Sequence, residues 1–463
     1  MDAEAAGTPP RDTRAAWKVY LCLIVPATIL LNLTFPNFHA PDDYDHIKRA
    51  YTLFHAPFRA ITPEGSSTGA MVDTGLTEYI EGQIPLVKST RRLTAEQRLA
   101  LERNTRIGWT GRQTFSEMPG ALSYFPLLYA PQALMLEIGG LSGASVEISV
   151  LWARFANGVV GVALAAVGLY LLRGGQAIVL LSLLLPRTLL QFASNSTDPI
   201  LYGLALIIIS LGLRTGGSGR LRSSAIAVAL FISGTVRPPI AALALTPAVQ
   251  AIRERRWLNV ALLSGACVAA AVWMIAVLPS VTDLRCGDLG GLGLKLRTFA
   301  SQWPLLIGRT FDDRSLYYYI SFVGHYGWGD GRIGTIGTPM PGWVYSSAIL
   351  LFGIAFCQDL FSQFQLSALF RLSLLLGALC SVLLTFFAMY VGCTNVSRSV
   401  IGGVQGRYFV TPLFAIAPAI GGLASSGGIR WRQGLFWLLV FAWVAACTAT
   451  MIANSTQLYV ELR

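Results

Sequence analysis

Apolar runs long enough to cross a lipid bilayer recur along almost the whole chain, and no other feature limits its fold as strongly. A spanning helix needs about 20 predominantly apolar residues. The chain is 54% hydrophobic and only 13% charged, whereas a soluble domain usually carries about 25% charged residues. No alternating pattern of about ten residues repeats, so an outer-membrane barrel is not expected. The sequence therefore predicts an all-α polytopic membrane protein.

The charges between these runs predict the orientation of the chain. Arg residues in the short loops should face the cytoplasm, which gives one integral membrane domain, 1–463, with about eleven spans and an outside C-terminus. A cytoplasmic tail, 1–16, precedes the first span. Two large loops, 36–141 and 280–341, should lie outside. The expected spans are about 17–35, 147–172, 177–193, 199–213, 224–235, 240–252, 257–279, 343–358, 371–392, 408–424 and 434–452.

Three further features belong to these loops. Pro126 and Pro131 break the segment Pro119 to Leu141, and we expect it to form interfacial helices rather than a span. The net charge of +11 fits loop arginines better than a nucleic-acid surface. Cys286 and Cys393 both fall in outside loops, where a disulfide between them is possible.

A cluster of charged residues directly follows the first span. The segment from Pro41 to Arg49 holds three Asp residues and one His. Such residues at the boundary between water and lipid are costly without a role, and groups placed there can act on a substrate that itself lies in the membrane. Asp42 and Asp43 are therefore candidate catalytic residues, and His46 is a candidate substrate-binding residue.

A second acid, Asp198, follows a later outward span. If the two spans are neighbours in the bundle, Asp42 or Asp43 could face Asp198, and such a pair suits general-base work on an acceptor hydroxyl. Alternatively, Asp198 before Pro199 is an ordinary helix cap. Further acids in the second large loop are Asp312, Asp313 and Asp330.

A metal site is a weaker interpretation of the first cluster. Asp43-Tyr44-Asp45 has the form of the DxD motif with which soluble nucleotide-sugar transferases hold a divalent metal. No Gly-rich loop or Rossmann-like pattern accompanies it, and one His beside two Asp residues more often makes a hydrogen bond than a metal bond. We predict no required cofactor, although a divalent metal remains an alternative.

Two arginines are the best candidates for binding an anion. Arg237 lies between two short apolar runs that Pro238 and Pro239 interrupt, and Arg407 lies in a Gly-rich entry to a span. The planar guanidinium matches phosphate, although an interfacial arginine can also simply extend toward water. His325 lies in an aromatic, Gly-rich stretch that suits either a sugar ring or the headgroup zone. The predicted substrate-binding residues are His46, Arg49, Arg237, His325, Gln405, Arg407 and Tyr408.

Several of these segments, in order, resemble a bacterial membrane-protein family catalogued as a domain of unknown function, which is grouped with the GT-C glycosyltransferases. The signature Pro41-Asp42-Asp43, His46 and Arg49-Ala50-Tyr51 resembles the family's Pro-Asp-Glu-x-x-His-x-x-Arg-Ala-Tyr. The other matching segments are 124–132, 154–157, 194–198, 237–239, Gly327-Trp328 with 338–341, and 405–409. One position departs from the family pattern, because Asp43 replaces its usual Glu.

The resemblance implies a fold and a reaction. It implies a GT-C-like bundle with a catalytic Asp in the first outside loop, here Asp42 with Asp43 beside it, and a second acid at Asp198. It also implies a sugar donor on a polyprenyl phosphate such as undecaprenyl phosphate. We predict an inverting glycosyltransferase of the bacterial inner membrane, acting at its periplasmic side on a glycan or lipid-linked acceptor. The alternatives are a transporter or flippase for a lipid-linked glycan and a non-catalytic scaffold.

Overall fold

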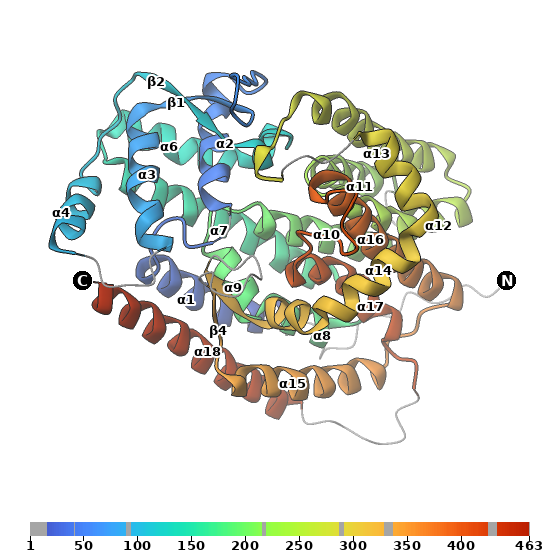
Figure 1. Ribbon diagram of the computed structural model, residues 1–463. Coiled ribbons are helices and arrows are strands. Elements are labelled where there is room, and N and C mark those ends of the chain that lie inside the picture. Colours follow the sequence, from blue (N-terminus) through green and yellow to red (C-terminus); the bar gives the residue numbers. More distant parts are fainter. Residues whose placement is uncertain are drawn as a thin grey trace.

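The computed structural model describes residues 16–40, 42–88, 94–214, 219–286, 291–327, 337–424 and 433–462. Among them, six helices are long and apolar enough to cross a membrane. The helices that contain these stretches are α1 (Ala16–Thr34), α7 (Val146–Leu171), α13 (Trp257–Val277), α15 (Gly342–Leu360), α16 (Ala368–Cys393) and α18 (Gln433–Leu462). The predicted, mostly helical fold with several helices of membrane length is thus confirmed (Figure 1). The count of eleven spans stays a prediction.

The remaining expected spans are shorter helices, and some of them are divided where a proline occurs. The segment 177–193 divides into α8 (Gln176–Leu183) and α9 (Pro186–Phe192), and a new helix starts at Pro186. Similar short pieces make up the other segments. They are α10 (Asp198–Gly212), α11 (Gly219–Gly234), the 3₁₀ helix η3 (Pro238–Ala244), α12 (Leu245–Arg253), η6 (Gly406–Phe409) and α17 (Val410–Ile420).

The first large loop is a folded unit with its own small core. Its elements are α2 (Asp43–His55), β1 (Gly69–Asp73), α3 (Thr74–Lys88), α4 (Ala95–Asn104), β2 (Gln113–Glu117), α5 (Pro119–Leu122), η2 (Pro126–Tyr129) and α6 (Ala130–Ser142). Ile47, Leu76, Tyr79 and Met118 form a buried cluster with residues of α7. Strands β1 and β2 pair antiparallel, with Gly69 opposite Glu117. This ribbon, and a second one described below, depart from the all-α prediction.

The second large loop also contains regular structure that the sequence did not predict. It holds the 3₁₀ turns η4 (Leu278–Ser280) and η5 (Leu284–Cys286), the long helix α14 (Leu292–Val323), and the antiparallel strands β3 (His325–Gly327) and β4 (Gly337–Pro339). Leu306 and Tyr318 of α14 share a buried cluster with Phe386 and Tyr390 of α16. Helix α14 is therefore packed against the bundle.

Close packing of α7 against α10 places the start of α10 deep in the molecule. A Cβ atom on Gly161 would lie 2.4 Å from the Pro199 Cβ, and one on Gly203 would lie 2.4 Å from the Leu164 Cβ. Small residues on both helices therefore let their backbones approach closely, as in many membrane bundles. Asp198, at the first position of α10, is buried as a result.

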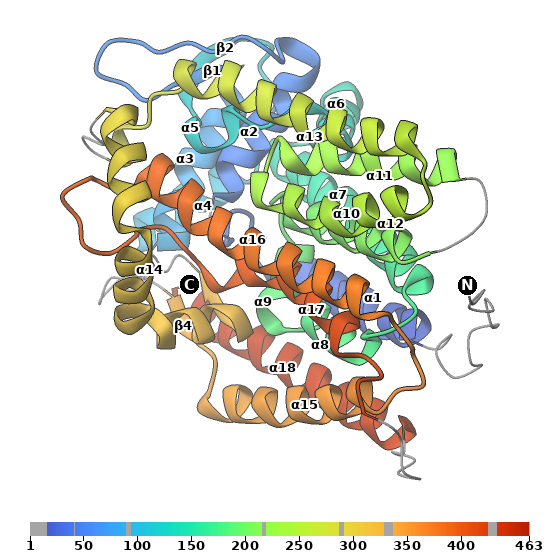
Figure 2. The ribbon, with the colours of Figure 1, turned by 90° about the vertical axis from the view of Figure 1, so that its right-hand side faces the viewer.

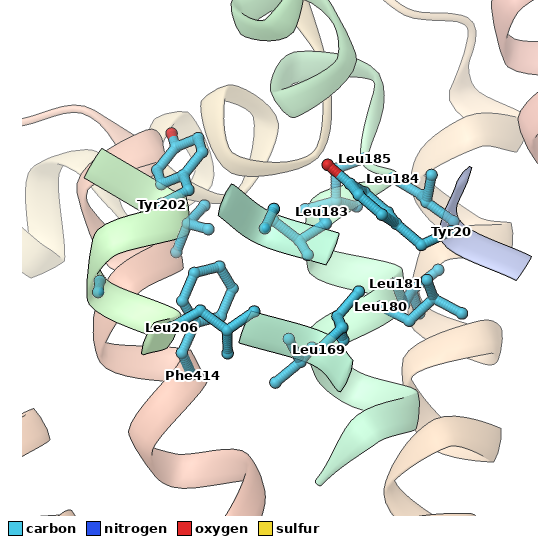
Figure 3. Close-up of a cluster of buried hydrophobic side chains, with 14 of the residues drawn as sticks. Tyr20, Leu169, Leu180, Leu181, Leu183, Leu184, Leu185, Tyr202, Leu206 and Phe414 are labelled. Atoms are coloured by element: carbon cyan, nitrogen blue, oxygen red, sulfur yellow. The ribbon is translucent and has the colours of Figure 1, made fainter. Parts of the chain in front are cut away.

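The leucines of α8 are buried between this helix and four other helices. Leu180, Leu181 and Leu183 are fully buried. Helix α8 contacts α1, α7, α15 and α17, and its leucines share a buried cluster with Tyr20, Leu169, Leu206 and Phe414, which are labelled in Figure 3. A helix that is apolar on all sides belongs in a core or a membrane, and here α8 forms the centre of the bundle.

Helix α13 lies at the periphery instead, beside α11 (Figure 2). In the most apolar stretch of 18 residues in this segment, only 11% of the residues are buried.

Cys393, at the end of α16, is disulfide-bonded, whereas Cys22, Cys267, Cys357, Cys380 and Cys447 are free. The side chain of Cys286, the partner suggested by the sequence, lies outside the described residues.

Candidate active site

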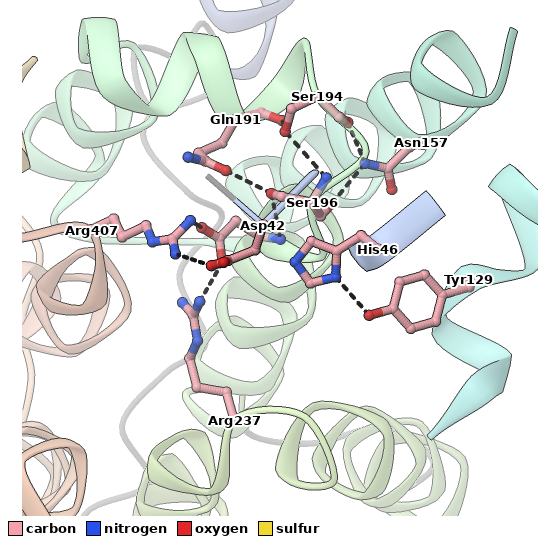
Figure 4. Close-up of polar contacts among 10 residues, drawn as sticks. Asp42, His46, Tyr129, Asn157, Gln191, Ser194, Ser196, Arg237 and Arg407 are labelled. Carbon is pink, nitrogen blue, oxygen red and sulfur yellow. Dashed lines mark hydrogen bonds and ion pairs between the residues drawn. The ribbon is translucent and has the colours of Figure 1, made fainter. Parts of the chain in front are cut away.

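Asp198 is the centre of a buried ionic cluster. Its side chain is 1% exposed. One carboxylate oxygen is hydrogen-bonded and ion-paired to Nη2 of Arg237, and Oδ2 lies 3.4 Å from Nη1 of Arg407. A buried carboxylate needs such partners to offset the cost of leaving water. Figure 4 shows both arginines directed toward this acid cluster, Arg407 from the left and Arg237 from below.

Arg407 also contacts Asp42. Its Nη2 lies 3.6 Å from Oδ2 of Asp42, and the Arg407 side chain is 6% exposed whereas that of Asp42 is 46% exposed. Asp42 adopts a left-handed backbone conformation, with a φ of 63°, which is uncommon for a residue with a side chain. Strained residues of this kind concentrate at active sites. Asp42 is the acid of this cluster that an incoming molecule can reach.

An aromatic ring supports the two arginines. The guanidinium carbon of Arg237 lies 4.8 Å from the ring centre of Tyr408, and that of Arg407 lies 5.4 Å from it. Such cation–π contacts contribute about 0.5–2 kcal/mol each, depending on their exposure to water. The structure thus brings together five of the residues singled out from the sequence: Asp42, Asp198, Arg237, Arg407 and Tyr408.

Arg407 owes its position to a close approach between η6 and α14. A Cβ atom at Gly406 would lie 2.2 Å from the Tyr318 carbonyl oxygen, and the Gly406 amide donates to Ser321 Oγ at 2.8 Å. Gln405, just before the turn, accepts the Tyr408 amide with its carbonyl oxygen at 3.0 Å. Gly406 is therefore the residue that lets Arg407 reach the cluster.

Asp43 contacts the main chain before α10. Its Oδ1 accepts the Asn195 amide at 2.5 Å, and the residue is 1% exposed. Burial raises the pKa of Asp43 to about 6, and the nearby Arg154 opposes this shift. The carboxylate thus joins α2 to the turn that ends at Asp198.

A polar network holds that turn in place. The Asn157 amide donates to the carbonyl oxygens of Ser194 and Ser196, each at 2.8 Å. Ser196 Oγ donates to Gln191 Oε1 at 2.6 Å (Figure 4). No role was predicted for Asn157 or Gln191. Asn157 lies in one of the segments that carry the family resemblance, and this resemblance is the feature of the sequence that could have pointed to it.

His46 lies one helical turn after Asp42, because its amide donates to the Asp42 carbonyl oxygen at 3.1 Å. Its Nδ1 is 2.7 Å from the Tyr129 hydroxyl, and its ring stacks on Tyr124 with ring centres 6.1 Å apart. Burial lowers the pKa of His46 to about 4, although Asp42 and Asp198 oppose this shift. The imidazole is therefore neutral at pH 7. The sequence pointed to neither tyrosine as a partner of His46.

The other residues singled out from the sequence lie elsewhere. Asp45 pairs with Arg285 at 3.1 Å, and Arg49 donates to main-chain carbonyl groups. Asp312 and Asp313 are exposed on α14. The backbone of His325 pairs with Pro339, but its side chain and Asp330 lie outside the described residues.

Asp43 and Asp45 of the DxD sequence have different partners, Asn195 and Arg285. In the part of the chain that the structure describes, no group of three or more His, Cys, Asp or Glu side chains is arranged to hold a metal ion.

Comparison with known proteins points to one family. The model of a family described as predicted membrane protein (DUF2142) matches residues 26–417. No curated protein matches the chain. Among solved structures, that of ArnT from Cupriavidus metallidurans in the apo state is similar, with 13% sequence identity and a TM-score of 0.33 over 94% of this chain and 78% of that one. A likeness this distant carries no functional argument.

Proposed function

The chain belongs to the DUF2142 family of predicted membrane proteins, and we propose that it is a GT-C type glycosyltransferase that takes a sugar from a polyprenyl-phosphate donor. The observation that carries this proposal is the unequal burial of one ion pair. The Asp42 carboxylate is 46% exposed, and the Arg407 that holds it is 6% exposed. A reachable acid beside buried, preorganised cations suits transfer of a group away from a phosphate.

Asp42 acts as the general base in this mechanism. It accepts the proton of the acceptor hydroxyl while the hydroxyl oxygen forms a bond to the anomeric carbon of the sugar. The bond between that carbon and the phosphate oxygen breaks on the opposite face, and its electron pair stays on the phosphate. A single displacement of this kind inverts the anomeric centre. General-base catalysis of this type contributes about 10²–10⁴-fold.

Arg237 and Arg407 stabilise the departing phosphate. Arg237 Nη1 and Arg407 Nε have no hydrogen-bond partner among the described residues, so donors remain for phosphate oxygens. Asp198 holds both guanidinium groups in place through its two oxygens. Donors that are already oriented need no rearrangement as charge develops, and this makes electrostatic stabilisation effective in a buried site.

Asp43 acts as a positioning residue, and His46 binds the acceptor. Asp43 fixes the turn before α10 through the Asn195 amide. His46 is held by Tyr129 and lies one turn from Asp42. As a neutral imidazole it can exchange hydrogen bonds with an acceptor hydroxyl without adding charge. We place the site at the periplasmic side of a bacterial inner membrane, where the acceptor is a glycan or a lipid-linked molecule.

The arrangement of the charges favours an enzyme over a flippase. Asp42 follows α1, Asp198 begins α10, Arg237 follows α11 and Arg407 precedes α17. Asp198, Arg237 and Arg407 therefore lie at the ends of apolar helices, and Asp42 lies in the loop after α1, directly before α2. A transporter would need charges along a path through the bundle, so transport of a lipid-linked glycan is the weaker candidate.

The test is sugar transfer by purified protein from synthetic polyprenyl-phosphate sugars to membrane extracts. Asp42→Asn should fold normally, because Asn also tolerates the left-handed conformation. It should lower the rate about 10²–10⁴-fold, because it removes the base. Asp45→Asn is the matched control, with the same change one turn along the same helix, and should retain most of the activity. Full transfer by Asp42→Asn would sink the mechanism.

A further inference from the structure

A pocket lies between α13 and the loop that follows α2, and neither Asp42, Asp198, Arg237 nor Arg407 lines it. It has a volume of about 200 Å³ and is lined by Arg49, Phe58, Arg59, Leu122, Trp273 and Val277, among others. Arg49 belongs to α2, and Phe58 and Arg59 follow that helix. Trp273 and Val277 belong to the last turns of α13. The proposed reaction uses none of these residues.

Arg49 brings an uncompensated charge to this pocket. The residue is 2% exposed. Its Nη atoms donate to Pro57 O at 2.7 Å, Tyr124 O at 2.9 Å and Thr52 Oγ1 at 3.2 Å, and all three acceptors are neutral. Its Nε has no hydrogen-bond partner among the described residues. A buried cation without a counter-ion is costly, so an anion in the pocket would stabilise the fold.

Arg59 adds a second positive charge at the mouth of the pocket. Its side chain is exposed, and within the described part of the chain it pairs with no carboxylate. Two arginines line one cavity, and no acid is among its lining residues in the described part of the chain; such a pair suits a phosphate group. The exposed arginine can attract the anion, and the buried one can hold it.

Most of the other lining residues are apolar, and the pocket lies beside exposed apolar side chains of the loop after α2 and of α13. Phe58 is 72% exposed and Ile275 is 72% exposed. The Trp273 ring lies edge-on to Phe58, with ring centres 6.1 Å apart, and its indole nitrogen donates to Ser123 O at 2.9 Å. A tryptophan held in this way at the end of an apolar helix is typical of the membrane interface.

We propose that this pocket binds an anionic membrane phospholipid, with its phosphate at Arg49 and Arg59 and its acyl chains along the exposed face of α13. A free phosphate ion would use the two arginines but not the aromatic and aliphatic walls. The combination of the two surfaces therefore favours a lipid. The site is distinct from the reaction centre, because Arg49 lies about 10 Å along α2 from Asp42 at 1.5 Å per residue.

The test uses the full-length protein in nanodiscs that contain equal amounts of phosphatidylglycerol and phosphatidylcholine. Lipids that remain bound are identified by native mass spectrometry. The wild-type protein should retain phosphatidylglycerol preferentially. Arg59→Gln should reduce that preference about fivefold, because one arginine near an anionic lipid contributes roughly 1 kcal/mol. Arg112→Gln, which removes an exposed arginine elsewhere in the first loop, is the matched control and should leave the preference unchanged.

Two further measurements separate the possible ligands. Phe58→Ala should also weaken retention of phosphatidylglycerol, because the acyl chains lose an apolar contact. Inorganic phosphate at millimolar concentration should not displace the lipid. The proposal is overturned if Arg59→Gln retains the wild-type preference, or if inorganic phosphate displaces the lipid completely. Neither measurement involves sugar transfer, so the result is independent of the proposed function.

Discussion

Helix α2 carries two acid–arginine pairs that are built in opposite ways. In the first pair, the Asp42 carboxylate is 46% exposed and Arg407 is 6% exposed. In the second pair, Asp45 is 2% exposed and Arg285 is 42% exposed. Each arginine also holds a second acid, which is the buried Asp198 for Arg407 and the partly exposed Asp283 for Arg285.

The difference indicates what each pair can do. An exposed carboxylate on a buried arginine can meet a substrate, whereas a buried carboxylate under an exposed arginine cannot. Asp45 and Arg285 instead tie α2 to the segment that follows α13. The same residue types, one helical turn apart, thus provide a reactive group in one place and a structural link in the other.

The largest effect should come from removing the second acid of the first pair. Asp198→Asn leaves two buried arginines without their shared counter-ion, and breaking such a buried pair costs about 3–5 kcal/mol. Thermal unfolding in detergent should show a large decrease in Tm. Asp283→Asn, the equivalent change in the second pair, should cost about 1 kcal/mol or less, because exposed ion pairs contribute little. Equal losses in the two variants would contradict the comparison.

A smaller effect should follow from changing each arginine to lysine. Arg407 bridges Asp42 and Asp198 through its two terminal nitrogens, and an ammonium group cannot reproduce this fork. Arg407→Lys should therefore lower sugar transfer about 10²-fold, as for loss of one oriented donor, while the charge is kept. Arg285→Lys should transfer sugar at close to the wild-type rate. The ratio of the two rates measures how far the two pairs differ in function.

The smallest effect concerns the pH dependence of stability. Burial raises the pKa of Asp45 to about 7, although Lys48 and Arg285 oppose the shift. Between about pH 4 and 7 the folded chain therefore holds a proton that the unfolded chain has lost, and stability falls as the pH rises through this range. Between pH 6 and 7.5, the decrease in Tm should be smaller in Asp45→Asn than in the wild-type protein, by on the order of 2 °C. Below pH 6 a slope should persist, because burial also raises the pKa of Asp43, to about 6. An unchanged slope above pH 6 would show that Asp45 stays ionised in the folded chain.

Much of the site was visible in the sequence because its residues stand where apolar runs end. Asp42, Asp198, Arg237 and Arg407 each interrupt or border such a run, and charges at these positions are costly without partners. The pattern of residues alone leaves Asp42 and Asp43 as alternatives for the reactive acid, and only the family resemblance favours Asp42. Adjacent residues on a helix point about 100° apart, so the direction of Asp43 depends on how α2 packs. In the observed packing of α2, the Asp43 carboxylate accepts the Asn195 amide.

The strands and the long helix α14 could not be predicted for a different physical reason. Strands β1 and β2 have five residues each, and their pairing depends on contacts between residues 40 to 48 positions apart, from Asp73 opposite Gln113 to Gly69 opposite Glu117. No local pattern marks such a ribbon. Helix α14 was assigned to a loop because its sequence is not apolar enough to span, although it packs along α16 through Tyr318 and Phe386. A hydropathy pattern identifies helices that cross the membrane better than helices, such as α14, that pack against the spanning helices.

The contact at Gly406 also links two distant parts of the molecule mechanically. The backbone of η6 touches that of α14 so closely that no side chain fits between them, and Ser321 of α14 holds the Gly406 amide. A displacement of α14 would consequently carry Arg407 with it and change the charge beside Asp42. Events in the second large loop, far from the first in sequence, can thus be transmitted to the reactive acid as a change in its electrostatic surroundings.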